Sequence, residues 1–272
     1  MNILVCVKQV PNTQEISIDP VTNTLIRDGV ESIVNPYDGY ALEAAARLKD
    51  KNADIKIYVL CMGPPQAEAA LRECLAVSAD VAYLASDRFF AGSDTLATSY
   101  ILSEAIKCIE TKEGIKFDMI FCGKQAIDGD TAQVGPQIAE CLDYAQITYA
   151  LTCEHKDGEL HVSKETEDGK EVLAIKFPCV VTFTKPNFDP RFISAKRRFA
   201  AKKAEIGTIG VDDLVGINRE KIGLKGSPTQ VRKTFVPQVK KGGVVFKEGP
   251  LEETAQKLAG LLVENKILVD IE

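Results

Sequence analysis

Short apolar runs alternate with helical patterns through the first two-thirds of the chain. Segments between the apolar runs carry apolar side chains at helical spacing, which predicts helices at Tyr37–Lys49, Gln66–Val77, Leu96–Ile109 and Gln137–Leu142. The apolar runs are rich in β-branched residues and are expected to be strands buried on both faces: Ile3–Val7, Ile55–Cys61, Val81–Ala85 and Met119–Cys122. This alternation predicts right-handed crossovers and a parallel sheet with helices on both sides.

The pattern changes after about residue 146. Leu160–Ser163, Val172–Lys176 and Cys179–Thr184 are strand-like, and turn-rich segments separate them. They predict an antiparallel extension of the sheet. The predicted fold is therefore α/β: a parallel-sheet, Rossmann-like nucleotide-binding domain over residues 1–184, with an antiparallel extension.

Residues 185–249 lack clear periodicity and are rich in proline, glycine and basic residues. Between Lys185 and Lys241 there are 14 basic and 5 acidic residues, a net charge of +9, so the rest of the chain carries −15 of the total of −6. We interpret this segment as an extended basic arm lying on another surface, with a disordered tail as the alternative. Residues 250–272 follow with an apolar stripe from Leu251 to Ile267, which predicts an amphipathic helix. We expect it to pack on a partner subunit; packing on its own chain is the alternative.

Composition excludes several classes of protein. With 33 basic and 39 acidic residues, the chain does not have the charge of a nucleic-acid-binding protein. No segment approaches the roughly 20 apolar residues of a membrane span, and the N-terminal segment lacks signal-peptide features, so we expect a cytoplasmic protein. The 8 cysteines form no CxxC pair and are expected to be reduced core thiols. The 2 histidines lie in a hairpin-like stretch, which makes a metal site or a histidine-based triad improbable.

The loops that follow the predicted strands are the expected ligand site, because parallel sheets bind ligands at the carboxyl ends of their strands. The loops 86–95 and 123–136 each lead into a helix, whose first amides are free to hold phosphate. Pro136 predicts a helix start nearby, with free amides around residues 131–135. Two such helix N-termini could share one pyrophosphate. Asp94, Asp128 and Asp130 would repel phosphate and are expected to cap helices or bind hydroxyl groups; ordinary turns with capped helices are the alternative for either loop. Neither GxGxxG nor GxxxxGK[ST] occurs in the sequence.

Four blocks in order carry a resemblance to a known family. They are Val5–Pro11, Asn35–Asp38 followed by Ala41–Ala45, Gly123–Asp130 with Gln133 and Gly135, and Lys164–Leu173 with Pro178–Thr182. Together they resemble the beta subunit of electron-transferring flavoproteins, over essentially all 272 residues. This family contains beta subunits that hold a structural AMP and beta subunits that hold a second FAD and bifurcate electrons. Residues 92–99 and 128–135 resemble the FAD-holding kind, and Ala132 and Val134 depart from the AMP-type pattern.

The resemblance implies a redox subunit of a heterodimer in anaerobic metabolism. Its FAD would take hydride from NADH and send one electron to ferredoxin or flavodoxin. The other electron would pass through the flavin of the alpha subunit to an acyl-CoA dehydrogenase-type enzyme. An AMP-holding, non-bifurcating beta subunit is the alternative. A stand-alone, ATP-binding protein of the universal-stress type is a third reading.

The resemblance also assigns cofactor-binding residues by matched position, and it assigns no catalytic or metal-binding residue. Those expected on the adenosine side are Cys6, Val7, Asn35, Met62, Gly123 and Gln133. Those expected on the pyrophosphate and flavin side are Asp94, Thr95, Thr98, Thr131 and Val134. The remaining expected contacts are Lys8, Pro11, Tyr37, Asp38, Gly63, Lys124, Gln125, Asp128, Gly129, Asp130, Ala132 and Gly135. The arm and the final helix match the family's partner-wrapping segment, and Arg191–Lys203 lies where dehydrogenase recognition is expected.

Overall fold

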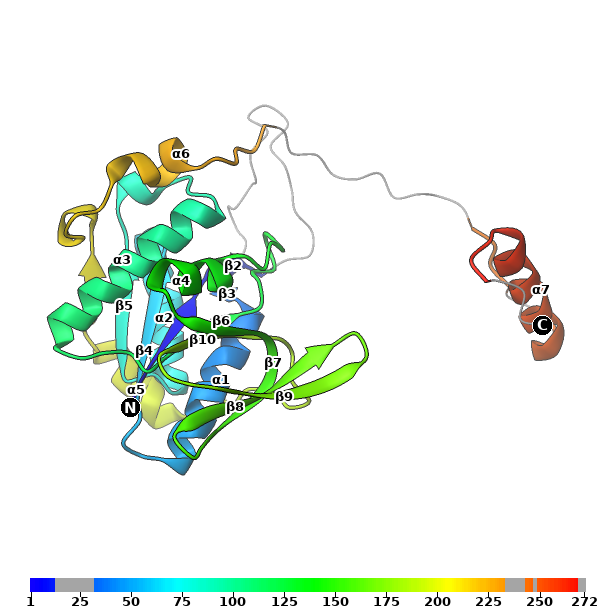
Figure 1. Cartoon of the computed structure of the whole chain (residues 1–272), viewed down its shortest axis with the longest axis horizontal. Coiled ribbons are helices and arrows are strands. Elements are labelled where there is room, and N and C mark those ends of the chain that lie inside the picture. The colour runs from blue at the N-terminus through cyan, green and yellow to red at the C-terminus, as the bar shows by residue number, and fades with distance from the viewer. Residues whose placement is uncertain (13–31, 233–242, 247–248, 269–272) are drawn as a thin grey trace. The chain divides into compact units, whose positions relative to one another are not determined.

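A computed structural model describes residues 1–12, 32–232, 243–246 and 249–268. The chain divides into two compact units, Met1–Thr234 and Phe235–Glu272, and each is described here by itself. The first unit contains the sheet and the helices that cover it (Figure 1).

Within the described residues, one sheet has the strand order β11-β5-β4-β1-β6-β10-β7-β8-β9. Its parallel strands are β1 (Asn2–Val7), β4 (Lys56–Met62), β5 (Val81–Ala85), β6 (Met119–Gly123), β7 (Ala145–Lys156), β10 (Cys179–Phe183) and β11 (Ile206–Ile209). The four strands predicted in the first half of the chain are confirmed, and nearly all of their residues are buried, as expected for strands covered on both faces. A short antiparallel pair, β2 (Gln9–Pro11) and β3 (Ser32–Val34), lies outside this sheet.

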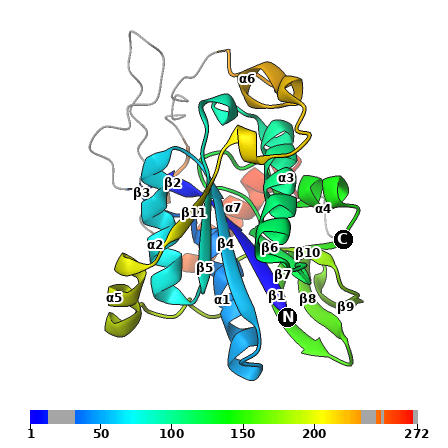
Figure 2. The ribbon, with the colours of Figure 1, turned by 90° about the vertical axis from the view of Figure 1, so that its left-hand side faces the viewer.

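Helices cover both faces of the sheet, as the alternation predicted (Figure 2). On one face α1 (Pro36–Lys51), α2 (Glu68–Val77) and α5 (Ala195–Lys203) pack in one apolar cluster. On the other face α3 (Thr95–Glu113) and α4 (Val134–Leu142) pack in a second cluster. Alternate residues of β1 divide between the clusters, with Ile3 and Val5 in the first and Leu4 and Cys6 in the second.

The antiparallel extension is also present. β8 (Glu159–Thr166) pairs antiparallel with both β7 and β9 (Gly169–Ile175). Sequence analysis predicted β8 and β9 but missed β7. Most residues of β7 are exposed or half-buried, so it lacks the continuous apolar run of the central strands.

The boundary expected after residue 184 does not match the structure, because the first unit continues to Thr234. The segment expected to be an extended arm contains α5, and β11 extends the sheet as a parallel neighbour of β5. Short helical turns follow at η3 (Val211–Asp213), η4 (Arg219–Lys221) and α6 (Gly223–Gly226). Residues 233–242 and 247–248 of the expected arm lie outside the described residues.

In the second unit, α7 (Leu251–Glu264) confirms the predicted amphipathic helix. Leu251 and Leu258 are exposed on it. Its packing on a partner subunit stays a prediction. Among the described residues, none of the helices combines the length and apolar character that crossing a membrane requires.

Candidate functional site

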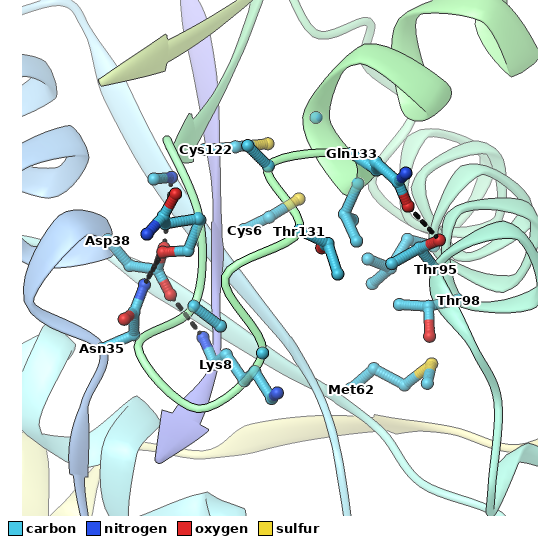
Figure 3. A pocket seen from close by; sticks show the side chains of 18 of the residues that line it. Cys6, Lys8, Asn35, Asp38, Met62, Thr95, Thr98, Cys122, Thr131 and Gln133 are labelled. Carbon is cyan, nitrogen blue, oxygen red and sulfur yellow. Dashed lines mark hydrogen bonds between the residues drawn. The ribbon is translucent and has the colours of Figure 1, made fainter. Parts of the chain in front are cut away.

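The site lies where the order in which the chain adds strands to the sheet reverses. From β1 the chain adds β4 and β5 on one side, whereas β6 and β10 lie on the other side. Ligands of open parallel sheets bind at such a switch point, beyond the carboxyl ends of the strands. A cavity of about 350 Å³ lies at this place, lined by the ends of β1 and β6 and by the loops that follow them (Figure 3). This volume is at the lower end of the range for small-molecule sites.

Most of the residues predicted to bind the cofactor line this cavity. They are Cys6, Val7, Lys8, Asn35, Asp38, Met62, Asp94, Thr95, Thr98, Gly123, Lys124, Gln125, Gly129, Thr131, Ala132, Gln133, Val134 and Gly135. Sequence analysis missed Ser93, Leu102, Cys122 and Ala126, which also line it. Leu102 follows Thr95 and Thr98 at helical spacing, so extending that face of α3 by one turn would have identified it.

Five predicted residues lie outside the cavity lining and have other contacts. Pro11 pairs with Ser32 between β2 and β3. Tyr37 packs edge-on against Tyr40, and the amide of Gly63 donates to the carbonyl of Ala85. The carboxylates of Asp128 and Asp130 bind Lys8 and Gln125 respectively, at 2.7 Å in both cases. These contacts support the loops around the cavity.

The buried carboxylate of Asp38 joins three elements below the cavity. One oxygen accepts the amide of Lys8 at 2.7 Å, just after β1, and the other accepts the amide of Gly123 at 3.1 Å, at the end of β6. Asp38 itself lies in the first turn of α1. Burial raises the pKa of Asp38 to about 7, although its hydrogen-bond donors and the charge of Lys8 oppose this rise. The two strand ends and the helix are therefore held at one carboxyl group.

Asn35 holds the loop after β6 in place. Its Nδ2 donates to Oδ1 of Asp38 and to the carbonyl of Gln125, both at 2.9 Å, and its Oδ1 accepts the amide of Ile127 at 3.2 Å. Asn35 is buried, with 1% of its surface exposed, and all these groups are paired. The side chain thus fixes the position of the loop relative to α1.

The loop after β6 then turns through two residues with left-handed backbone conformation. Asp130 and Ala132 both have φ of 53°, a region that residues other than glycine seldom occupy. Asp128 forms an ion pair with Lys8 across the loop. Strain of this kind is retained where the surrounding contacts impose it, often at functional sites. Here it places residues 131–135 along the cavity.

The N-terminus of α4 faces the cavity and has the properties of an anion site. Val134 and Gly135 are its first residues, so their amides have no intrahelical acceptor, and Pro136 has no amide hydrogen. A side chain at Gly135 would collide with Thr182 of β10, so only glycine allows this close approach. The helix dipole adds a partial positive charge at the same place. Backbone amides of this region can bind phosphate oxygens.

The N-terminus of α3 differs from the expectation of a second phosphate-binding helix end. Oδ1 of Asp94 accepts the amide of Ala97 at 3.0 Å, and Oδ2 accepts the amide and the hydroxyl of Thr229 at 2.9 and 2.7 Å. These bonds hold the pKa of Asp94 below its usual value, although burial opposes them. A carboxylate that is ionised and caps the helix repels phosphate. The predicted capping role of Asp94 is confirmed, and α4 is the helix end suited to an anion.

A side-chain bond connects the two helices at the cavity. Oγ1 of Thr95 donates to Oε1 of Gln133, the residue that precedes α4. One turn further, Oγ of the buried Ser99 lies 2.9 Å from Oε1 of Gln137. The N-terminal turns of α3 and α4 are therefore joined by two side-chain hydrogen bonds beside the cavity.

Known proteins are similar to this chain over nearly its whole length. The family model described as "Electron transfer flavoprotein domain" matches residues 22–214. A protein named "Electron transfer flavoprotein subunit beta" from Megasphaera elsdenii is 50% identical over 98% of this chain and 100% of its own length. This chain belongs to the electron transfer flavoprotein family.

Two further relatives extend the comparison. The "Caffeyl-CoA reductase-Etf complex subunit CarD" of Acetobacterium woodii is 46% identical over 98% of this chain and 100% of its own length. "Protein FixA" of Azotobacter vinelandii is 48% identical over 88% of this chain and 85% of its own length. The resemblance to the beta subunit found in the sequence is confirmed.

Proposed function

We propose that this chain is the beta subunit of a heterodimeric, electron-bifurcating electron transfer flavoprotein of anaerobic metabolism, with FAD in the cavity at the carboxyl ends of β1 and β6. When bound, this FAD would accept hydride from NADH and supply electrons to ferredoxin or flavodoxin and, through the flavin of an alpha subunit, to an acyl-CoA dehydrogenase-type enzyme. The cytoplasmic location expected from the sequence is part of this proposal.

One observation carries the proposal: an anion-binding helix end opens on a cavity at the switch point of the sheet, in a chain of this family. The amides of Val134 and Gly135 would bind the phosphate oxygens, where the dipole of α4 stabilises negative charge. Gly123 lines the same cavity at the end of β6, and a side chain at this position would collide with the first turn of α1. These residues fit the pyrophosphate of a dinucleotide that is held mainly by backbone amides.

Other lining residues would orient the cofactor. Thr95 and Thr98 place hydroxyl groups on the α3 side, and Met62 and Leu102 supply apolar surface. Thr131 lies between them and the strand ends. The residues Cys6, Val7, Asn35, Met62, Gly123 and Gln133 remain proposed contacts for the adenosine side. The chain binds and orients, whereas the flavin provides the redox chemistry.

A second candidate, an AMP-holding subunit that supports the flavin of its partner, is favoured by the size of the cavity. A volume of about 350 Å³ is small for a dinucleotide. Under the main proposal the AMP portion of FAD occupies the cavity and the isoalloxazine ring extends toward the partner chain. Asp94 caps the N-terminus of α3, so this helix end does not bind phosphate and the cavity offers fewer anion contacts.

The segment Arg191–Lys203 is the proposed recognition surface for the dehydrogenase. Phe192 and Phe199 are 99% and 70% exposed, and α5 is rich in lysine and arginine. Arg72 of α2 donates to the carbonyl of Ala201 at 2.7 Å, which fixes α5 on the domain. Exposed aromatic groups among positive charges suit docking on an acidic protein surface.

Identification of the nucleotides released from the purified complex tests this function. The proposal predicts two FAD and no AMP for each heterodimer, and reduction of the bound flavin by NADH. One FAD and one AMP would establish the second candidate instead. A stable, isolated chain that binds ATP would support the universal-stress reading and overturn both.

A further inference from the structure

Two cysteines lie side by side at the ends of β1 and β6. Cys6 and Cys122 are register partners in this parallel pair, and both line the cavity (Figure 3). Paired strands are about 4.8 Å apart, and paired residues point to the same face of the sheet. Cys6 and Cys122 are 8% and 5% exposed. The cavity is therefore the route by which a small reagent reaches both sulfur atoms.

The two thiols also interact with each other. A hydrogen bond to Cys6, together with burial, raises the pKa of the Cys122 thiol well above its usual value. A protonated thiol is a poor nucleophile, which limits alkylation and disulfide exchange at this pair. Trivalent arsenic reacts differently, because one arsenic atom condenses with two neighbouring thiols and water is released.

We propose that Cys6 and Cys122 form a dithiol site for trivalent arsenicals that carry one organic group, and that this site is open when the cavity holds no nucleotide. Two S–H bonds and one As=O bond break, two As–S bonds form, and one molecule of water leaves. Arsenic remains trivalent and both sulfurs keep their oxidation state, so no oxidant is required. The organic group would lie against the apolar side chains of Met62 and Leu102, which line the same cavity.

The remaining cysteines provide the controls. Cys61 and Cys74 are fully buried in the apolar cluster on the opposite face, and Cys141 is exposed. Cys153 lines a second cavity beside α1 and lies close enough to the buried Cys179 for the two thiols to interact, so it is the alternative reactive thiol. Cys179 does not line that cavity, so a reagent that needs two adjacent thiols reachable from one cavity distinguishes Cys6 and Cys122 from this pair.

The test uses the full chain in its natural complex, freed of nucleotide and treated with phenylarsine oxide. Intact-mass analysis should find one phenylarsenic group for each chain. Cys6→Ala and Cys122→Ala should each reduce incorporation at least ten-fold, whereas Cys153→Ala should not. Peptide mapping of the unaltered protein should find the Cys6 and Cys122 peptides joined through one arsenic, a result that does not depend on whether the variants fold. Unchanged incorporation in either variant, or arsenic mapped to other cysteines, would overturn the site.

Protection by nucleotide is the second arm, and it rests on the proposed function. Reloading with FAD or AMP should slow incorporation at least ten-fold. Equal rates with bound nucleotide would refute the cavity as the route to the thiols. If no nucleotide binds while arsenic still joins Cys6 to Cys122, the dithiol site stands and the proposed function fails.

Discussion

Oγ1 of Thr95 donates a hydrogen bond of 2.8 Å to Oε1 of Gln133, and this bond joins the first residue of α3 to the residue that precedes α4. Both residues line the cavity. The two helix ends thus keep their spacing through a side-chain contact at the proposed cofactor site.

Thr95→Arg should reduce the nucleotide content of the complex at least ten-fold, because the long side chain would crowd the cavity. Thr95 is half-buried at a helix start, so the folded state should be retained, with a change in Tm of only a few degrees. Flavin absorbance and thermal denaturation measure the two effects. Thr111→Arg, on an exposed position of the same helix, is the matched control. Full flavin occupancy in Thr95→Arg would show that Thr95 does not face the cofactor.

Asn35→Ala should destabilise the protein by about 2–3 kcal/mol, because it leaves buried polar groups without partners. The amide of Ile127 and the carbonyl of Gln125 lose their side-chain contacts. Hydrogen exchange at the Ile127 amide should accelerate more than exchange in the central strands. Asn52→Ala removes a single contact near the surface and should change stability by less than about 1 kcal/mol. Equal effects of the two substitutions would contradict the role of Asn35.

Asp38 should make folding stability depend on pH between about 4 and 7. Its pKa in the folded chain is raised from 3.8 to about 7, so the folded state binds more protons than the unfolded state in this interval. The contribution of Asp38 is therefore fully present below pH 4 and is lost as the pH rises to 7, with a slope of up to about 1.4 kcal/mol per pH unit. Denaturant unfolding of the protein and of Asp38→Asn measures the difference in slope. Parallel pH profiles would show that Asp38 titrates normally.

Arg191→Met should weaken electron transfer to the dehydrogenase partner several-fold without changing nucleotide content. The Arg191 guanidinium binds Glu43 at 2.8 Å and Asp50 at 2.7 Å, which fixes the start of the proposed recognition segment on α1. Arg191 is partly exposed, so the loss of stability should be limited to about 1–2 kcal/mol.

Steady-state kinetics with the partner dehydrogenase and flavin absorbance measure these two effects. Arg88→Met, at an exposed position elsewhere, is the control. Normal kinetics in Arg191→Met would remove Arg191 as a positioning residue.

The sequence was sufficient for the central fold because its strands are buried on both faces and therefore appear as continuous apolar runs. β11 has four residues, one of them glycine, and it becomes a strand only by pairing with β5. A strand that forms only by pairing with a distant segment leaves no recognisable pattern in its own residues. The same limit explains why the domain boundary was placed too early.

The place of the cavity was predictable for a topological reason, because loops after parallel strands meet at one edge of the sheet. The individual residues came from the family resemblance, and their contacts with a cofactor stay a prediction. The hydrogen bonds from Thr229 to Asp94 could not be predicted, because Thr229 is distant in the sequence and belongs to a segment without periodicity. The contacts of Asn35 likewise depend on how the loop after β6 folds back on α1.

The most direct measurement is a crystal structure of the complex with its natural nucleotides. The account predicts an adenine dinucleotide in the cavity at the carboxyl ends of β1 and β6, with phosphate oxygens at the amides of Val134 and Gly135 and the flavin ring directed toward the partner subunit. A nucleotide bound elsewhere, or a mononucleotide in this cavity with no flavin attached, would contradict it.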